Sequence, residues 1–226
     1  MARAKPLILL IVVFYCASYA YAGKIIEMPH ERYYLGIPQV PLSEKRMPVL
    51  ICLPGWGVEA KNDVAMWAFP ANKNGFFLIE LDIDYTSPYT DTDARLVYER
   101  ILLIVAANAS KYNIDGGKIF IAGTSAGGMM AVSLSLMHPE KFVAVGAISA
   151  GRLGFGAVKF INEAKGKEYY FFHGQRDKSI PISEFYKTVQ VLKDHGAKVH
   201  FEVLPEGEHT LPSSCYREVL DWFKQF

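Results

Sequence analysis

The sequence has few cysteines, almost no net charge and none of the common metal-binding motifs. Its 226 residues include three cysteines, and it contains no Cys-x-x-Cys pair, no His-Glu-x-x-His segment and no carboxylate-rich loop. It therefore implies no zinc or calcium site. Lys and Arg number 24 and Asp and Glu 23, a formal net charge of +1. This balance gives no electrostatic reason to expect nucleic acid or an anionic membrane as a partner.

The sequence also lacks internal repeats, low-complexity tracts and linkers rich in Pro, Gly or Ser, which argues against several domains. Hydrophobic residues make up 51% and charged residues 21%, an ordinary balance for a globular protein. A chain of this length can bury one sizeable core but hardly two. We therefore expect a single domain over residues 23–226.

Residues 1–22 have the three parts of an export signal. Arg3 and Lys5 are basic, residues 7–15 are apolar, and Ala20-Tyr21-Ala22 supplies small residues before a cleavage point. We expect a signal peptide that is cleaved after Ala22, and a periplasmic or secreted mature protein without stable membrane insertion. The alternative is an uncleaved anchor, but the apolar run is shorter than the roughly 20 residues of a membrane span.

The three cysteines raise two further alternatives. A lipid anchor on Cys16 is disfavoured because Phe14 and Tyr15 before it are too bulky for a lipoprotein cleavage site. Export would permit a disulfide between Cys52 and Cys215. Since Cys52 sits inside an apolar run, a small buried thiol is the favoured interpretation.

From about residue 48 onward, short apolar runs alternate with longer amphipathic stretches. Runs without polar alternation are typical of strands that are covered on both faces. The expected strands are 49–53, 76–81, 118–122, 142–148, 168–172 and 199–204, and the expected helices are 91–112, 126–137, 183–195 and 213–226. One or two antiparallel edge strands are expected within 25–40. This alternation predicts an α/β protein with a mostly parallel sheet and helices on both faces.

The strongest motif is Gly123-Thr124-Ser125-Ala126-Gly127, which lies directly between an expected strand and an expected helix. In such a turn the residues two before and two after the serine nearly touch, so both must be glycine. The serine is strained and its hydroxyl is exposed above the sheet. The helix that follows points its N-terminus at the site, which makes the Ala126 N–H a candidate oxyanion donor. An ordinary glycine-rich turn is the alternative.

On this motif and its setting, the chain resembles the small, capless α/β-hydrolases of the esterase, thioesterase and dienelactone-hydrolase-like group, from about residue 48 to the end. The resemblance implies a single-domain α/β-hydrolase fold without a large cap. It also implies a catalytic acid after a later strand and a histidine after the last strand, in the order Ser, Asp, His.

Both of these places are filled. His173-Gly174, then Asp177, then Ile-Pro at 180–181, resembles the pattern around the catalytic acid, and Gly207-Glu208-His209 resembles the pattern around the base. An Asp that caps a surface turn is the alternative for Asp177. His173 is the main rival as base, but it precedes the acid, where the resemblance implies a structural histidine. The expected triad is Ser125, Asp177 and His209.

The second oxyanion donor is expected from Leu53-Pro54-Gly55-Trp56-Gly57. This segment resembles the Leu-His-Gly-x-Gly of the group, in which the N–H of the x residue, here Trp56, points into the oxyanion hole. Pro54 departs from the usual histidine, and a plain glycine turn is the alternative. Trp56, Tyr85 and Tyr89 are candidates for substrate contact, although ordinary packing explains loop aromatics equally well.

Two weaker signals are set aside. Ala147-Ile148-Ser149-Ala150-Gly151 imitates the serine turn, but it lacks the first glycine and follows the wrong strand. Asn108-Ala109-Ser110 matches a glycosylation sequon, but it falls within an expected helix.

The sequence predicts a serine hydrolase that cleaves carboxylic esters through an acyl-enzyme, without a metal or other cofactor. Export favours a polysaccharide acyl or feruloyl ester, a lipid ester or a polyester fragment as substrate. A serine peptidase is the first alternative, because the same triad cleaves amides, but no propeller or lid domain is evident. The second alternative is a hydrolase-fold binding protein that has lost catalysis. The complete set of triad residues argues against it.

Overall fold

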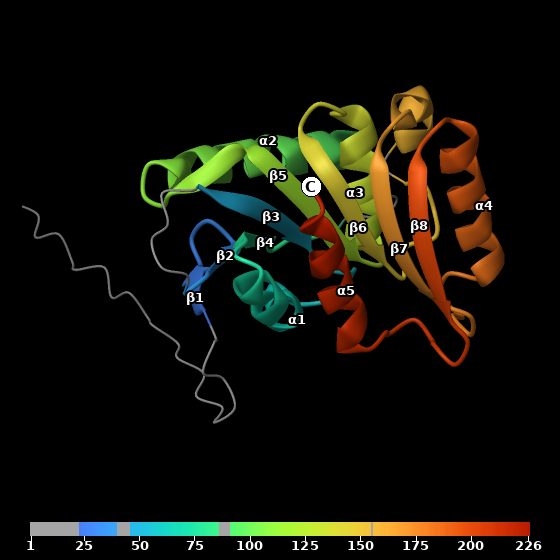
Figure 1. Ribbon diagram of the computed structural model, residues 1–226, viewed down its shortest axis with the longest axis horizontal. Coiled ribbons are helices and arrows are strands. Elements are labelled where there is room, and N and C mark those ends of the chain that lie inside the picture. Colours follow the sequence, from blue (N-terminus) through green and yellow to red (C-terminus); the bar gives the residue numbers. More distant parts are fainter. Residues whose placement is uncertain (1–22, 40–45, 86–90, 155) are drawn as a thin grey trace, which may run out of the picture.

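The structure is a computed structural model that describes residues 23–39, 46–85, 91–154 and 156–226. The strands are β1 Lys24–Met28, β2 Tyr33–Ile37, β3 Met47–Leu53, β4 Phe77–Leu81, β5 Ile114–Thr124, β6 Phe142–Ile148, β7 Glu168–Gly174 and β8 Lys198–Leu204. Over the described ranges these strands form one sheet in the order β1-β2-β4-β3-β5-β6-β7-β8 (Figure 1). The β1–β2 and β2–β4 pairs are antiparallel and the other pairs are parallel. The predicted α/β-hydrolase fold, with a mostly parallel sheet and antiparallel strands within 25–40, is confirmed.

Helices cover both faces of the sheet (Figure 1). They are α1 Ala60–Lys73, α2 Asp91–Ala109, α3 Ala126–Met137, the 3₁₀-helix η1 Ala157–Ala164, α4 Ile182–Asp194 and α5 Ser213–Phe223. One buried cluster joins the sheet to α2, α3, η1 and α4, and a second joins its other face to α1 and α5. Residues 49–53 of β3 are wholly buried between the two, as the lack of polar alternation in this run predicts.

Helix α1 is a correction, because the sequence predicts no helix between the first two central strands. Its buried positions do follow helical spacing, but Asp63, Pro70 and Asn72 occupy three of them. A buried stripe that contains a charge, a proline and an amide does not read as apolar, so the periodicity is hidden. The ends of several other elements differ from prediction by a few residues: α2 ends at Ala109 and β5 begins at Ile114.

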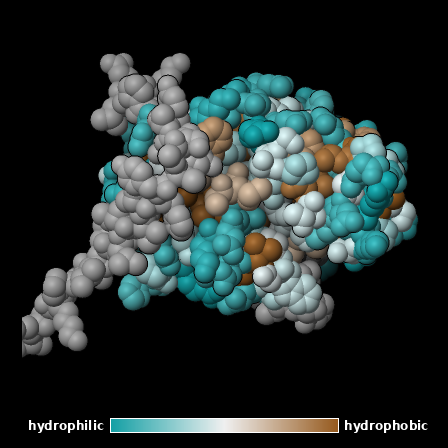
Figure 2. All heavy atoms as spheres, turned by 90° about the horizontal axis from the view of Figure 1, so that it is seen from below, coloured by the Kyte–Doolittle hydropathy of each residue, from teal (hydrophilic) through white to brown (hydrophobic). Residues whose placement is uncertain are grey.

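Between β6 and β7, where a cap domain would be inserted, the described residues contain only η1. This agrees with the prediction of a fold without a large cap. On the face seen in Figure 2, apolar side chains form small separate patches among polar ones. Large apolar side chains with more than half of their surface exposed include Trp56, Leu96, Leu103 and Val158.

Cys52 and Cys215 lie in the cluster between the sheet and α1 and α5, and both are buried free thiols. Burial raises the pKa of the Cys52 thiol well above its usual range. The buried-thiol interpretation therefore holds for both residues, and the alternative disulfide is not formed.

The predicted signal peptide, residues 1–22, lies outside the described residues, as does Cys16. Among the helices that the structure describes, none has the length and apolar character to cross a bilayer.

Candidate active site

Ser125 lies in the turn that joins β5 to α3, at the carboxyl end of the central strands. Its φ of 53° and ψ of −117° are strained for a residue with a side chain. A Cβ on Gly123 would lie 2.4 Å from the backbone of Gly127, and a Cβ on Gly127 would lie 1.9 Å from the Leu53 carbonyl oxygen. Both glycines are therefore required by the close approach of the chain. The sequence predicts the contact between residues 123 and 127, but not the contact of Gly127 with Leu53.

The structure brings the three predicted triad residues together. Asp177 follows β7 and His209 follows β8, so both lie at the same sheet edge as Ser125. His209 Nε2 lies 2.9 Å from Ser125 Oγ, and His209 Nδ1 lies 2.7 Å from Asp177 Oδ2. The carboxylate is buried, and the imidazole is 32% exposed. This chain of two hydrogen bonds is the arrangement in which a histidine takes a proton from a serine.

The second oxygen of Asp177 is also hydrogen-bonded. Asp177 Oδ1 accepts the backbone N–H groups of Ser179 and Ile180, at 2.8 and 2.9 Å. Both partners belong to the turn that leads into α4. The Ile-Pro segment that marked the acid in the sequence therefore supplies one of these two donors, and Ser179 before it supplies the other.

His173, the rival base, has a different environment. Its ring is wholly buried and stacks on Phe185 with the ring centroids 4.6 Å apart. Its Nε2–H donates to the Ile180 carbonyl oxygen at 2.9 Å, while Nε2 lies 3.5 Å from Asp177 Oδ2. Burial lowers the pKa of His173, which favours the neutral ring. His209, and not His173, therefore faces Ser125.

The loops that carry Asp177 and His209 are joined through their backbones, a feature that the sequence analysis missed. The Gln175 N–H donates to the Leu204 carbonyl oxygen at 2.9 Å, and the Arg176 N–H to the Gly207 carbonyl oxygen at 2.8 Å. A Cβ on Gly174 would lie 2.3 Å from the Glu208 carbonyl oxygen. The glycine after His173 therefore permits the close contact between the two loops.

The two predicted oxyanion donors belong to segments that flank Ser125. A Cβ on Gly55 would lie 3.6 Å from Ser125 Cβ, which places the Trp56 loop beside the serine. Ala126 is the first residue of α3, and the first N–H groups of a helix have no partner within it. Its N–H and the Trp56 loop therefore lie where backbone donors can stabilise an oxyanion next to Ser125 Oγ.

The candidate substrate-contact residues differ in exposure. Trp56 is 58% exposed and can meet a ligand with its ring, whereas Tyr85 is 8% exposed and packs in the core. For Tyr85 the packing interpretation fits this structure better. Tyr89 lies outside the described residues.

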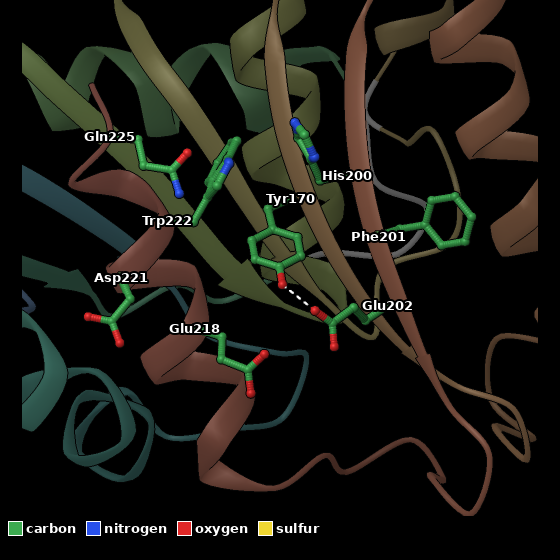
Figure 3. Close-up of a pocket in the computed structure, with 8 residues that line it drawn as sticks. All are labelled: Tyr170, His200, Phe201, Glu202, Glu218, Asp221, Trp222 and Gln225. Atoms are coloured by element: carbon green, nitrogen blue, oxygen red, sulfur yellow. Dashed lines mark hydrogen bonds between the residues drawn. The ribbon is translucent and has the colours of Figure 1, made fainter.

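A separate cavity of about 440 Å³ lies between α5 and strands β7 and β8 (Figure 3). It is lined by Tyr170, His200, Phe201, Glu202, Glu218, Asp221, Trp222 and Gln225. Among these residues, the Tyr170 hydroxyl donates to the Glu202 carboxylate (Figure 3). None of the three triad residues lines this cavity. Across the described ranges, no group of three or more His, Cys, Asp or Glu side chains is placed to hold a metal ion.

A mostly parallel sheet with a strained serine after β5, an acid after β7 and a histidine after β8 defines the α/β-hydrolase class. A model of the phospholipase/carboxylesterase family matches residues 92–225. The chain belongs to this family.

Three similar proteins carry different descriptions. A probable inactive carboxylesterase of Oryza sativa subsp. japonica is 31% identical over 96 residues, which cover 41% of this chain and 39% of that relative. A truncated carbohydrate esterase from gut microbiota is 19% identical with a TM-score of 0.67, over 85% of this chain and 90% of that one. A putative dipeptidyl aminopeptidase IV from Bacteroides ovatus is 16% identical with a TM-score of 0.70, over 85% of this chain and 33% of that one. At these identities the two structures establish the fold alone.

Proposed function

We propose that this protein is a serine esterase in which Ser125 is the nucleophile, His209 the general base and Asp177 the residue that orients it. The observation that supports this most is the continuous hydrogen-bond chain from Asp177 through His209 to the strained Ser125. A structural role alone does not require a strained serine that faces a half-buried histidine, because strain of this kind costs about 1–3 kcal/mol and is found most often at functional sites.

The reaction follows from the geometry. As Ser125 Oγ attacks the acyl carbonyl, His209 Nε2 takes its proton, and Asp177 stabilises the imidazolium through Nδ1–H. The N–H groups of Ala126 and Trp56 hold the oxyanion. His209 then gives the proton to the leaving alcohol, and an acyl-enzyme on Ser125 remains. A water molecule, activated by His209 in the same way, releases the carboxylic acid.

We further propose that the signal peptide directs this activity outside the cytoplasm, where the substrates are acylated or feruloylated polysaccharides, lipid esters or polyester fragments. The carbohydrate esterase among the similar structures fits the first of these. Mass spectrometry of the protein recovered from its native compartment should find Gly23 as the first residue. An intact Met1, or a lipid on Cys16, would contradict cleavage after Ala22.

Probe labelling, steady-state kinetics and thermal unfolding test the activity. A fluorophosphonate probe should label the wild-type protein and leave Ser125→Ala unlabelled, because only an activated serine reacts. Matched p-nitrophenyl ester and anilide substrates should be cleaved with a clear preference for the ester. Ser125→Ala should lose several orders of magnitude in kcat with an unchanged melting temperature, and His209→Ala should lose turnover to a similar extent.

The other outcomes identify the alternatives. A labelled protein that prefers the anilide would be a peptidase. An unlabelled wild-type protein would be a binding protein without catalysis, in keeping with the description of the rice relative as inactive. Near-wild-type esterase activity in Ser125→Ala would place the nucleophile elsewhere.

A further inference from the structure

Ser149, which follows β6, shares a positive φ with Ser125. In the described part of the chain, the residues other than glycine with positive φ are Arg32, Ser125 and Ser149, and φ of Ser149 is 52°. Glycine adopts this conformation without strain. A buried serine with this φ costs conformational free energy that a glycine would not. Strain of this kind points to a functional role for the side chain.

The side chain of Ser149 has a single defined contact with the candidate active site. Its hydroxyl is wholly buried and donates to the His209 carbonyl oxygen at 2.7 Å. This contact joins the end of β6 to the loop after β8, 60 positions away in the sequence. Because the partner is the backbone of His209 and not its ring, the hydroxyl of Ser149 is not prepared for nucleophilic attack.

The neighbouring residue connects the same strand end to the nucleophile. The Ser125 N–H donates to the Ile148 carbonyl oxygen at 2.8 Å, and the Ser149 N–H donates to the Phe172 carbonyl oxygen at 2.8 Å. Residues 148 and 149 thus contact the backbones of both Ser125 and His209. Displacing either backbone would change the distance between Ser125 Oγ and His209 Nε2.

We propose that Ser149 is a positioning residue for His209, and that its hydroxyl holds the backbone of the base at the distance Ser125 requires; this inference rests on the proposed function. Asp177 orients the imidazole ring through its side chain, and Ser149 fixes the main chain from which that ring extends.

Two substitutions separate positioning from stability. Ser149→Gly removes the hydroxyl and also relieves the backbone strain, so it should melt above Ser149→Ala, which loses the same buried hydrogen bond. Ser149→Ala removes the hydroxyl and keeps the strain, so it should melt lower. In both variants kcat should fall about 10- to 100-fold while KM changes little, because a small misplacement of the base affects the chemical step.

Ser135→Ala is the matched control. Ser135 is also wholly buried on α3, and its hydroxyl likewise donates to a backbone carbonyl oxygen, that of Val132, at 2.7 Å. Its loss should lower the melting temperature and leave kcat unchanged. The inference is wrong if kcat in Ser149→Gly stays within about twofold of the wild type, or if Ser135→Ala lowers kcat as much as Ser149→Ala does.

A measurement without substrate keeps this test separate from the proposed function. The proton on His209 Nδ1, hydrogen-bonded to Asp177, should give a low-field proton NMR resonance that Asp177→Asn removes. In Ser149→Gly this proton should exchange with water faster than in the wild type, even if no ester is hydrolysed. Unchanged exchange would overturn the positioning role, whereas absent hydrolysis in the wild type with faster exchange in the variant would overturn only the esterase assignment.

Discussion

Asp177 uses its two oxygens for different purposes. Oδ1 accepts two backbone N–H groups, and Oδ2 faces His209 Nδ1. An asparagine at this position would keep its oxygen on the two backbone donors and turn its NH₂ group toward the histidine. The ring would then carry its proton on Nε2, toward Ser125, where it cannot accept the serine proton.

Asp177→Asn should therefore lower kcat about 10³- to 10⁴-fold with little effect on the melting temperature. Steady-state hydrolysis of p-nitrophenyl acetate and thermal unfolding measure the two effects. Asp194→Asn is the control. Asp194 is exposed on α4 and also accepts a hydrogen bond, from the Gln190 amide, and its substitution should leave the activity unchanged. A loss of less than about tenfold in Asp177→Asn would show that the orientation of the base matters little here.

At the level of elements, the loops after β7 and β8 act as one unit. Gly174 is the point of closest approach, since a Cβ there would lie 2.3 Å from the Glu208 carbonyl oxygen and 2.4 Å from the Gly207 carbonyl oxygen. Both contacts are with backbone, which cannot move aside as a flexible side chain can. A methyl group must therefore displace the segment that carries His209.

Gly174→Ala should lower the free energy of unfolding by about 1–3 kcal/mol, the usual cost of overpacking, and should also lower kcat at least about tenfold because the base moves. Gly116→Ala is the control in another strand, where the nearest atom to the new Cβ is a Val105 methyl at 3.5 Å. Urea unfolding and steady-state kinetics measure both. A Gly174→Ala protein with wild-type kcat would indicate that the two loops relax independently.

The sequence predicts those elements whose signals are local. Gly123 and Gly127 lie within five residues of each other, and the uninterrupted apolar runs of the central strands indicate burial on both faces. The sequence does not predict α1, because Asp63 interrupts its buried stripe. It also does not predict the contact of Ser149 with His209 or the role of Gly174, because both depend on residues brought together by strand order, which no local pattern contains.

At the level of the whole molecule, two acidic side chains are buried on the face of the sheet that α1 and α5 cover. Glu80 of β4 is wholly buried, and Asp63 of α1 is 5% exposed. Burial and the nearby charge of Asp63 raise the pKa of Glu80 well above its usual range, and burial raises the pKa of Asp63 to about 6. The folded protein therefore holds these protons more tightly than the unfolded chain, and its stability should fall as the pH rises above about 4.

Glu80→Gln removes one of these two buried ionisable groups. Relative to the wild type, its free energy of unfolding should rise by at least about 1.4 kcal/mol between pH 4.5 and 7.5, the equivalent of one pKa unit. Urea unfolding at the two pH values measures this difference. Glu99→Gln, at an exposed position on α2, should show the same pH dependence as the wild type. If Glu80→Gln also parallels the wild type, Glu80 ionises as freely in the folded protein as in the unfolded chain.

In the part of the chain that the structure describes, no cap covers Ser125, and this has a consequence for substrate length. Between β6 and β7 the described residues form only η1, and the exposed Trp56 and Val58 lie on the loop beside Ser125. A site of this kind can contact a short acyl group but offers little surface to bury a long alkyl chain. Burial of such a chain would contribute roughly 0.8 kcal/mol per methylene.

Across acetyl, butyryl, octanoyl and palmitoyl esters of one alcohol, kcat/KM should favour the short chains, by about tenfold or more over palmitoyl. Measurements below the critical micelle concentration avoid aggregation of the longer esters. A steady rise of kcat/KM with chain length would instead require an apolar groove next to Ser125, and Trp56→Ala would then be expected to reduce that rise.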